Sequence, residues 1–368
     1  DSSTSRGLGD VYKRQIQKQT AGASLLLPAC RPCDTISVMK QTFTYQITEQ
    51  DQGRTIEQFL RLRGFSRRLL VRLRKTDHGI CLGAGGETPV YTTKILSEGD
   101  LLTIRVPDDS PSGHIVPVKQ EFTILYEDED LMVIDKPAGM PVHPSQGNFY
   151  NTLANGVAWY FAQKGESFTF RAVNRLDRDT TGLLIIAKHL LSAALLSEMV
   201  AKKQIRRQYL AAVSGKTEES GSVCAPIARA DGSTIERCVD EERGEYACTH
   251  YQRLYYCPEK DCSLILLSLE TGRTHQIRVH MKHIGHPLYG DFLYHPDYRF
   301  IGRQSLHSFR LSFSHPLTGK EMTFEARIPD DFSFAIPDGY SVSGGPALSG
   351  YSALSDHPAP SVRPDRQA

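Results

Sequence analysis

The sequence predicts an α+β protein: a mixed, largely antiparallel central sheet flanked by helices, preceded by a small α/β domain. Two longer helical runs occupy residues 151–161 and 190–203. A shorter strand–helix–helix–strand pattern occupies residues 41–107, and 368 residues are enough for two such domains. Strand-length apolar runs dominate residues 121–330, at 131–134, 182–187, 208–213 and 263–269.

Three segments lie outside these two domains. Residues 1–40 have no sustained hydrophobic period, so we expect a non-native or disordered leader, with Met39 as the native start. Residues 108–120 are rich in Pro, Gly and small polar residues and predict a linker. Residues 331–368 hold many Ser, Pro and Gly, which predicts a disordered tail.

Composition limits the class of protein. No apolar run approaches the roughly 18 residues that a membrane span needs, so we expect no membrane association. The eight cysteines have no regular spacing in a chain too long for a disulfide-stapled module, which predicts free thiols in a reducing cytoplasm. Cys30 and Cys33 form a single CxxC without a second pair at zinc spacing, so we expect no metal there.

The small domain is built element by element from residue 43. Residues 43–47 alternate like a strand. Thr55 and Ser66 are good N-cap residues for two successive helices, which Gly64 separates. The second helix would turn its leucines inward and its arginines outward. A strand at 79–82, a glycine-rich turn at 83–86 and a strand at 99–106 complete the domain.

Positive charge is concentrated in these two helices. Residues 54–75 contain eight Lys or Arg and one acid, Glu57, although the net charge of the whole chain is only +1. Such a local excess attracts a polyanion, and the alternative is a solvated basic face. The plan resembles the S4 RNA-binding domain in its start GRTIEQFL (53–60), its Ser-Arg-Arg helix entry (66–68) and its Gly-Asp pair (99–100). The resemblance implies RNA contacts from Arg67, Arg68, Arg72, Arg74 and Lys75.

A polar turn at 175–181 leads into the apolar strand at 182–187. A carboxylate on such a turn, at the mouth of a buried strand, is well placed for a reaction site. The adjacent Arg175 and Arg178 would keep Asp177 ionised. On these residues alone, an ordinary salt-bridged turn is the alternative.

A second polar constellation occupies residues 269–285. Thr274 is a good N-cap and Gly285 a good residue to follow a helix, which predicts a helix of about ten residues. His275, Arg278 and Lys282 would share one stripe of it. Four histidines lie at 275, 280, 283 and 286, but no HExxH pattern and no clear carboxylate or thiolate partner accompanies them, so we expect no metal.

Six segments in order resemble the RluA-type pseudouridine synthase family over about 200 residues. They are IDKPAGMPVHP (134–144), NRLDRDTTGLL (174–184), RQYLA (207–211), GRTHQIRVH (272–280), GHPLYGD (285–291) and LHS (306–308). Asn174 stands where the family usually has His, and Thr181 where it usually has Ser. The resemblance implies the pseudouridine synthase fold and the isomerisation of uridine to pseudouridine in RNA, without cofactor or metal.

The resemblance also implies a catalytic set. Asp177 would act at the ribose, Arg278 would hold its carboxylate, and Tyr209 would stack on the uracil. The target base must leave its helix to react, and Arg175 would fill the vacated space. Further substrate contacts are implied for Asn174, Thr181, His275, Gln276 and His307.

The substrate would be ribosomal or transfer RNA, and we expect a monomer. Two other functions compete with this one. A non-catalytic S4-type RNA-binding protein is disfavoured because Asp177, Tyr209 and Arg278 are all present. A glycoside-cleaving hydrolase would use Asp177 and Asp179 as a pair, but adjacent arginines disfavour the raised pKa that its acid requires.

Overall fold

The computed structural model describes residues 37–38, 41–83, 88–107 and 115–337. Most of the predicted leader, including Met39 and the CxxC at 30–33, lies outside the described residues. So do residues 84–86 of the glycine-rich turn, residues 108–114 of the predicted linker and most of the predicted tail. Within the predicted leader, β1 (Ser37–Val38) pairs in parallel with β8 (Glu166–Ser167).

The small N-terminal sheet has the strand order β2-β5-β3-β4, and all its pairings are antiparallel. As predicted, the Thr55 hydroxyl accepts from the Gln58 amide to begin α2, and Ser66 caps α3. Phe43, Phe59 and neighbouring apolar side chains form the core beneath the two helices. The elements are β2 (Gln41–Gln46), η1 (Glu49–Asp51), α2 (Ile56–Leu62), α3 (Arg67–Lys75), β3 (Ile80–Leu82), β4 (Thr88–Pro89) and β5 (Leu101–Val106).

A nine-stranded sheet forms the centre of the larger domain. Its order is β11-β14-β15-β10-β16-β9-β7-β6, with β17 paired to β16. Only the β9–β16 pairing is parallel in this sheet, which confirms the mixed, largely antiparallel prediction. Its strands are β6 (Thr123–Glu127), β7 (Leu131–Lys136), β9 (Thr181–Ala187), β10 (Arg206–Ser214), β11 (Ser220–Cys224), β14 (Cys248–Cys257), β15 (Cys262–Leu269), β16 (Leu306–Ser314) and β17 (Glu321–Glu325).

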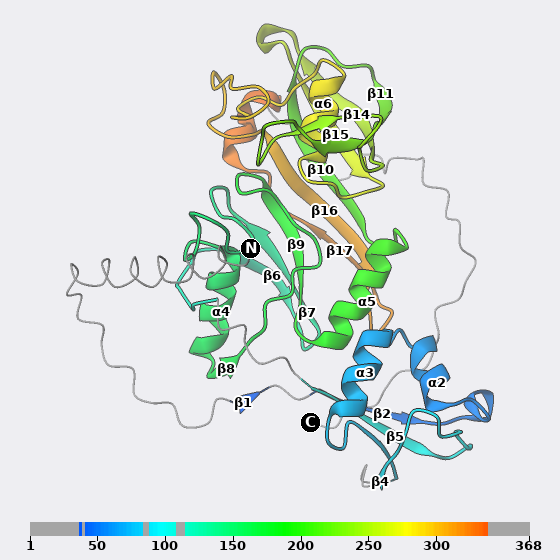
Figure 1. Cartoon of the computed structure of the whole chain (residues 1–368). Coiled ribbons are helices and arrows are strands. Elements are labelled where there is room, and N and C mark those ends of the chain that lie inside the picture. The colour runs from blue at the N-terminus through cyan, green and yellow to red at the C-terminus, as the bar shows by residue number, and fades with distance from the viewer. Residues whose placement is uncertain (1–36, 39–40, 84–87, 108–114, 338–368) are drawn as a thin grey trace, which may run out of the picture. The chain divides into compact units, whose positions relative to one another are not determined.

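Helices cover both faces of this sheet (Figure 1). One face packs against α4 (Leu153–Gln163) and α6 (Gln276–His283), and the other against α5 (Leu190–Ala201) and η3 (Asp330–Ala335). All seven residues of β9 are buried because both faces are covered. The remaining elements are a hairpin of β12 (Ile227–Arg229) with β13 (Arg237–Val239), and η2 (Pro258–Lys260).

The parallel contact between β9 and β16 depends on a glycine. Gly182 has a φ of 105°, and a Cβ at this position would lie 2.2 Å from the Ser308 carbonyl oxygen. Only glycine tolerates both this backbone conformation and this approach. The contact places the turn before β9 beside the chain that enters β16 at Leu306.

Three predictions differ from the structure. The helix at 276–283 begins after His275, in the left-handed region at φ 59°, rather than after Thr274. The predicted tail from residue 331 has an ordered start, because η3 buries Phe332 completely. Cys224 and Cys248 lie opposite each other on β11 and β14 and form a disulfide instead of free thiols.

None of the helices of the described residues reaches both the length and the hydrophobicity of a membrane span.

Candidate active site

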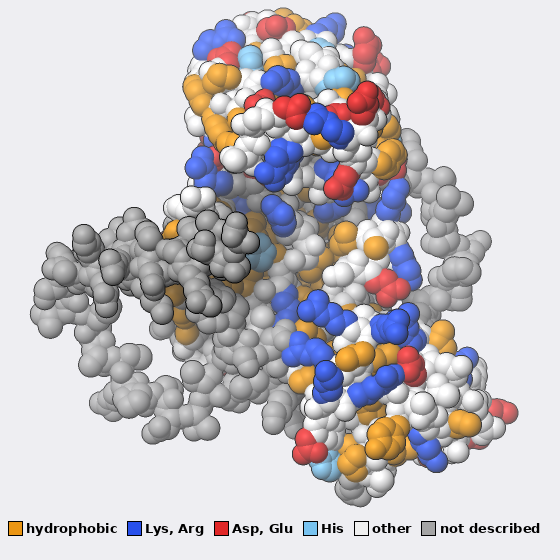
Figure 2. All heavy atoms as spheres, viewed as in Figure 1, with side chains coloured by type: hydrophobic (Ala, Val, Ile, Leu, Met, Phe, Trp, Pro, Cys, Tyr) orange, Lys and Arg blue, Asp and Glu red, His pale blue; other side chains and the backbone are white. Residues whose placement is uncertain are grey.

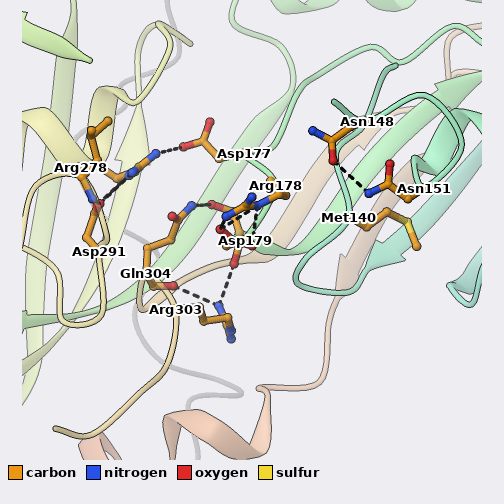
Figure 3. A network of polar contacts seen from close by, with 12 residues as sticks. Met140, Asn148, Asn151, Asp177, Arg178, Asp179, Arg278, Asp291, Arg303 and Gln304 are labelled. Atoms are coloured by element: carbon orange, nitrogen blue, oxygen red, sulfur yellow. Dashed lines mark hydrogen bonds and ion pairs between the residues drawn. The ribbon is translucent and has the colours of Figure 1, made fainter. Parts of the chain in front are cut away.

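Asp177 and Arg278 meet although they are 101 positions apart in the sequence. The Arg278 Nη1 donates to Asp177 Oδ2 at 2.9 Å. The rest of the guanidinium binds Asp291 in bidentate fashion, with Nε and Nη2 donating at 2.6 and 2.7 Å. Figure 3 shows Arg278 between these two carboxylates. One arginine therefore ties the turn before β9 to the chain that follows α6.

The three side chains differ in their exposure to solvent, and this difference indicates the role of each one. The side chains of Arg278 and Asp291 are 2% and 0% exposed, whereas that of Asp177 is 27% exposed. Desolvation lowers the pKa of Arg278, but the bonds and charges of Asp291 and Asp177 outweigh it and hold that pKa above its usual value. Asp291 holds the Arg278 guanidinium in place, and the Asp177 carboxylate is the one that remains accessible to solvent.

The turn that carries Asp177 is held from outside at three successive residues. Lys136 Nζ donates to the Arg178 carbonyl at 2.9 Å, and Arg303 Nη1 donates to the Asp179 carbonyl at 3.2 Å. Gln304 Nε2 donates to the Thr180 hydroxyl at 2.9 Å, and Figure 3 shows Arg303 and Gln304 directed at this turn. These bonds restrict the position of the carboxylate before any substrate arrives.

Lys136 is fully buried and joins two loops. Besides the Arg178 carbonyl, its Nζ donates to the carbonyls of Pro137 and Met140 at 2.7 and 2.9 Å. Burial lowers the pKa of Lys136 to about 7, opposed by the charges of Asp179 and Asp177. Its three bonds join the end of β7 to the turn before β9, so it is a positioning group rather than one that faces solvent.

Tyr209 lies on β10 and pairs with Ser308 of β16. It is 4% exposed, and burial raises the pKa of its phenol, against the lowering effects of the Arg207 charge and of Ser308. It therefore remains protonated near neutral pH.

His275 faces the same carboxylate from the start of α6. Its Nε2 lies 3.9 Å from Asp177 Oδ2, and its Nδ1 is 2.9 Å from the Tyr294 hydroxyl. Burial lowers the pKa of His275, so its imidazole is neutral near pH 7. The Tyr294 ring also lies 5.0 Å from the Arg278 guanidinium, which it helps to cover.

Three residues predicted to contact the substrate are buried in the protein. Gln276 donates to the Cys248 carbonyl and the Thr249 hydroxyl, and accepts from the Thr271 hydroxyl and the Arg273 amide. The Asn174 Oδ1 accepts from the Ile185 amide at 3.0 Å, and only 7% of the residue is exposed. His307 is fully buried. Gln276 is fully bonded within the protein, whereas Asn174 Nδ2 and His307 Nε2 are buried without a hydrogen-bond partner among the described residues. The substrate contacts expected of these three residues stay predictions.

The His307 ring stabilises the residue that opens β9. Its Nδ1 lies 2.8 Å from the Thr181 hydroxyl, so two predicted substrate contacts bind each other. Burial, with the nearby charge of Arg303, lowers the pKa of His307 to about 3. Arg175, in contrast, is exposed next to the site, as its predicted role requires.

Of the arginines expected to act on Asp177, the structure places Arg278 against it and Arg178 against another carboxylate. Arg178 binds Asp179 through Nε and Nη2 at 3.1 and 2.8 Å, not Asp177. Arg278 supplies the cation, as the resemblance implied. Sequence reasoning also assigned no role to Asp291, Lys136 or Arg303. Asp291 and Lys136 lie inside two of the six family-like segments, 285–291 and 134–144, and this position was the sequence feature that could have indicated a role for them.

Two groups of three side chains among the described residues could hold a metal ion. They are Asp128 with Asp130 and His315, and Cys248 with His250 and Glu270. The second group requires reduction of the Cys224–Cys248 disulfide, because a disulfide sulfur is not a thiolate ligand. Neither group includes Asp177. Both ring nitrogens of His280, on the predicted histidine-rich helix, contact protein oxygens, of Thr249 and Ala225.

Comparison with known proteins defines the class. Residues 130–283 match the family model described as RNA pseudouridylate synthase. The chain is 39% identical over 283 residues to the uncharacterized RNA pseudouridine synthase YjbO of Bacillus subtilis, covering 77% of this chain and 98% of that protein. The chain belongs to the RluA-type RNA pseudouridine synthase family, and its activity is that of an isomerase.

Two further relatives have similar identity to this chain. The ribosomal large subunit pseudouridine synthase D of Zymomonas mobilis is 40% identical over 266 residues, which cover 68% of this chain and 81% of that protein. YhcT, an uncharacterized RNA pseudouridine synthase of Bacillus subtilis, is 37% identical over 243 residues, covering 66% of this chain and 80% of the relative.

Replacing Asp291 with Ala should leave Arg278 as a buried cation without its bidentate partner. We expect the free energy of unfolding to fall by about 3–5 kcal/mol, and pseudouridine formation to fall with it. Chemical denaturation measures the first effect. Asp297→Ala is the matched control, because it removes a carboxylate from an arginine, Arg299, that is 67% exposed. Equal loss of stability in both variants would contradict the anchoring role of Asp291.

The buried neutral His307 should make the protein sensitive to acid. Between pH 6.5 and about 3 the unfolded state binds a proton that folded His307 does not, so stability falls as pH falls through this window. The slope contributed is at most about 1.4 kcal/mol per pH unit. Chemical denaturation at several pH values across this range measures the free energy of unfolding. In His307→Gln this free energy should depend less steeply on pH than in the wild type, and in the exposed His283→Gln its pH dependence should be unchanged. Identical slopes in all three proteins would exclude this contribution.

Proposed function

We propose that this enzyme isomerises uridine in large-subunit ribosomal RNA, with Asp177 as the reacting carboxylate. The observation that carries the assignment of Asp177 is its environment. Oδ2 is held by Arg278, while Oδ1 has no hydrogen-bond partner among the residues that the structure describes. An oriented carboxylate with one free oxygen on the open side can reach a bound ribose.

The reaction balances with the groups of the protein and the substrate alone. The N1–C1′ bond breaks, the uracil turns, and a C5–C1′ bond forms. C5 loses a proton and N1 gains one, so no water, electron or further reactant enters the product. The carboxylate of Asp177 acts at the ribose, where cleavage leaves C1′ electron-poor.

Arg278 and Tyr209 complete the proposed catalytic set. The buried Arg278–Asp291 pair keeps the cation in place, and Arg278 in turn keeps the carboxylate aimed. Tyr209 provides an aromatic wall for the detached uracil, and its protonated phenol is available to donate a hydrogen bond. Arg175, exposed beside Asp177, fills the space left by the flipped nucleotide.

Two features support ribosomal RNA as the substrate. A relative with 40% identity carries the name ribosomal large subunit pseudouridine synthase D. The S4-like unit also presents a basic helix: four of the five predicted contact residues on α3 are exposed. Figure 2 shows Lys and Arg side chains gathered over α3. Such a helix binds phosphates without reading the sequence, which suits a large structured RNA.

The rival functions make separable predictions at the turn before β9. A hydrolase that used Asp177 and Asp179 as a pair would release free uracil. The Asp179 carboxylate is bound by Arg178 and is 16% exposed, so it does not form a second reactive acid beside Asp177. A non-catalytic RNA-binding protein would bind RNA and change nothing in it.

Asp177→Asn should abolish the isomerisation while RNA binding persists. We expect pseudouridine formation in a large-subunit ribosomal RNA transcript to fall by at least about a thousandfold. Asp179→Asn is the control, because it removes the neighbouring carboxylate but leaves the Arg278–Asp177 pair. Free uracil is assayed in parallel. Unchanged activity in Asp177→Asn, or uracil as the product, would overturn the assignment.

A pseudouridine map of cellular RNA tests the proposed substrate. Deleting the gene should remove pseudouridine from one or a few positions in large-subunit ribosomal RNA, and restoring the wild-type gene should return it. The Asp177→Asn gene serves as the control that restores the protein without its chemistry. Loss confined to transfer RNA would contradict the ribosomal substrate while leaving the activity intact.

A further inference from the structure

A pocket lined by four arginines lies beside the active site. Its volume is about 520 Å³, which is within the range of sites for small ligands. The β12–β13 hairpin forms one wall, and the turn before α6 forms another. The charged residues that line it are Arg229, Arg237, Arg243, Arg273 and Glu245.

The pocket adjoins Asp177 through a short chain of contacts. Thr274 lines the pocket and directly precedes His275, whose Nε2 is 3.9 Å from Asp177 Oδ2. The Arg237 amide donates to the Tyr294 hydroxyl, which contacts the other ring nitrogen of His275. The pocket is therefore separated from the Asp177 carboxylate by His275, so an RNA strand bound at Asp177 can extend into it.

Two of the four arginines are already neutralised by acids. Arg243 binds Asp231 and Asp240 at 2.8 and 2.7 Å. Arg273 binds Glu245. The charge that remains in the pocket is therefore carried by the other two arginines, and both belong to the hairpin.

Arg229 and Arg237 form an unfavourable pair in the absence of an anion. They lie directly opposite each other in the β12–β13 ladder, where like charges destabilise the pairing. No carboxylate contacts either guanidinium among the residues that the structure describes. Two cations held side by side at the wall of a pocket form a site for a shared anion.

We infer that Arg229 and Arg237 bind a backbone phosphate of the nucleotide next to the target uridine. The inference rests on the proposed function, because that function supplies the anion: each nucleotide of an RNA strand carries one phosphate. Arginine binds phosphate in bidentate fashion and does not select the base, so the hairpin positions the strand rather than reading its sequence. His275 separates this phosphate site from the carboxylate of Asp177.

The test compares Arg229→Ala/Arg237→Ala with wild-type enzyme in single-turnover assays. The RNA is a synthetic fragment of large-subunit ribosomal RNA around the mapped uridine. We expect the concentration of enzyme for half-maximal rate to rise roughly tenfold, and its logarithmic salt dependence to fall by about 0.7, as for one phosphate contact on a single strand. The maximal rate should change little. Arg327→Ala, which removes an arginine that is 83% exposed, is the matched control.

A chemical change in the RNA locates the contact. Replacing one flanking phosphate at a time by an uncharged methylphosphonate should weaken the wild type at one position and leave the double variant unaffected there. The melting temperature of the double variant should not fall, because like charges have been removed. The inference would be overturned if the double variant needed the same enzyme concentration as the wild type for half-maximal rate. It would also be overturned if each methylphosphonate weakened both proteins equally. Wild-type enzyme that forms no pseudouridine in this RNA would instead refute the proposed function.

Discussion

The structure of the site depends on one buried cation shared by two carboxylates. A guanidinium as buried as that of Arg278 is stable only with partners, and Asp291 satisfies two of its nitrogens. Asp291 is itself tied to its loop, since its Oδ1 accepts from the amides of Leu293 and Tyr294. The direction of the remaining Nη1 is therefore determined before it meets Asp177. The reactive group is oriented by a partner that Asp291 and burial hold in one position.

The scaffold keeps that geometry by holding the turn as well as the side chain. Lys136 and the adjacent Arg303 and Gln304 bind three consecutive residues of the turn and come from two segments far apart in the sequence. The close contact of β9 with β16 at Gly182 brings the second segment to the turn. Because these bonds go to the neighbouring residues and Arg278 takes only Oδ2, the Asp177 carboxylate keeps one oxygen free for chemistry.

Periodicity and capping predicted much of this fold, since the α2 and α3 caps and the β7, β9, β10 and β15 runs are local properties. The prediction that Thr274 caps α6 was wrong. The Gln276 side chain accepts hydrogen bonds from the Thr271 hydroxyl and the Arg273 amide, and these bonds override the local preference for Thr274. The β12–β13 hairpin was not predicted, because strands of three residues show no period. Motif resemblance located Asp177 and Arg278 correctly as a pair. It could not give side-chain burial: Gln276 and His307, which it assigned to the substrate, are both buried in the structure.

The long sequence separations inside the site have a consequence for the order in which the enzyme becomes complete. Asp177 pairs with a residue 101 positions later, and Thr180 and Thr181 bind residues 124 and 126 positions later. A nascent chain that has left the ribosome as far as α6 carries Asp177 and Arg278, but neither the anchor Asp291 nor strand β16. Contacts of such range slow folding, because a long loop must close before they form. The catalytic carboxylate is therefore aimed only late in synthesis, after nearly the whole domain has emerged.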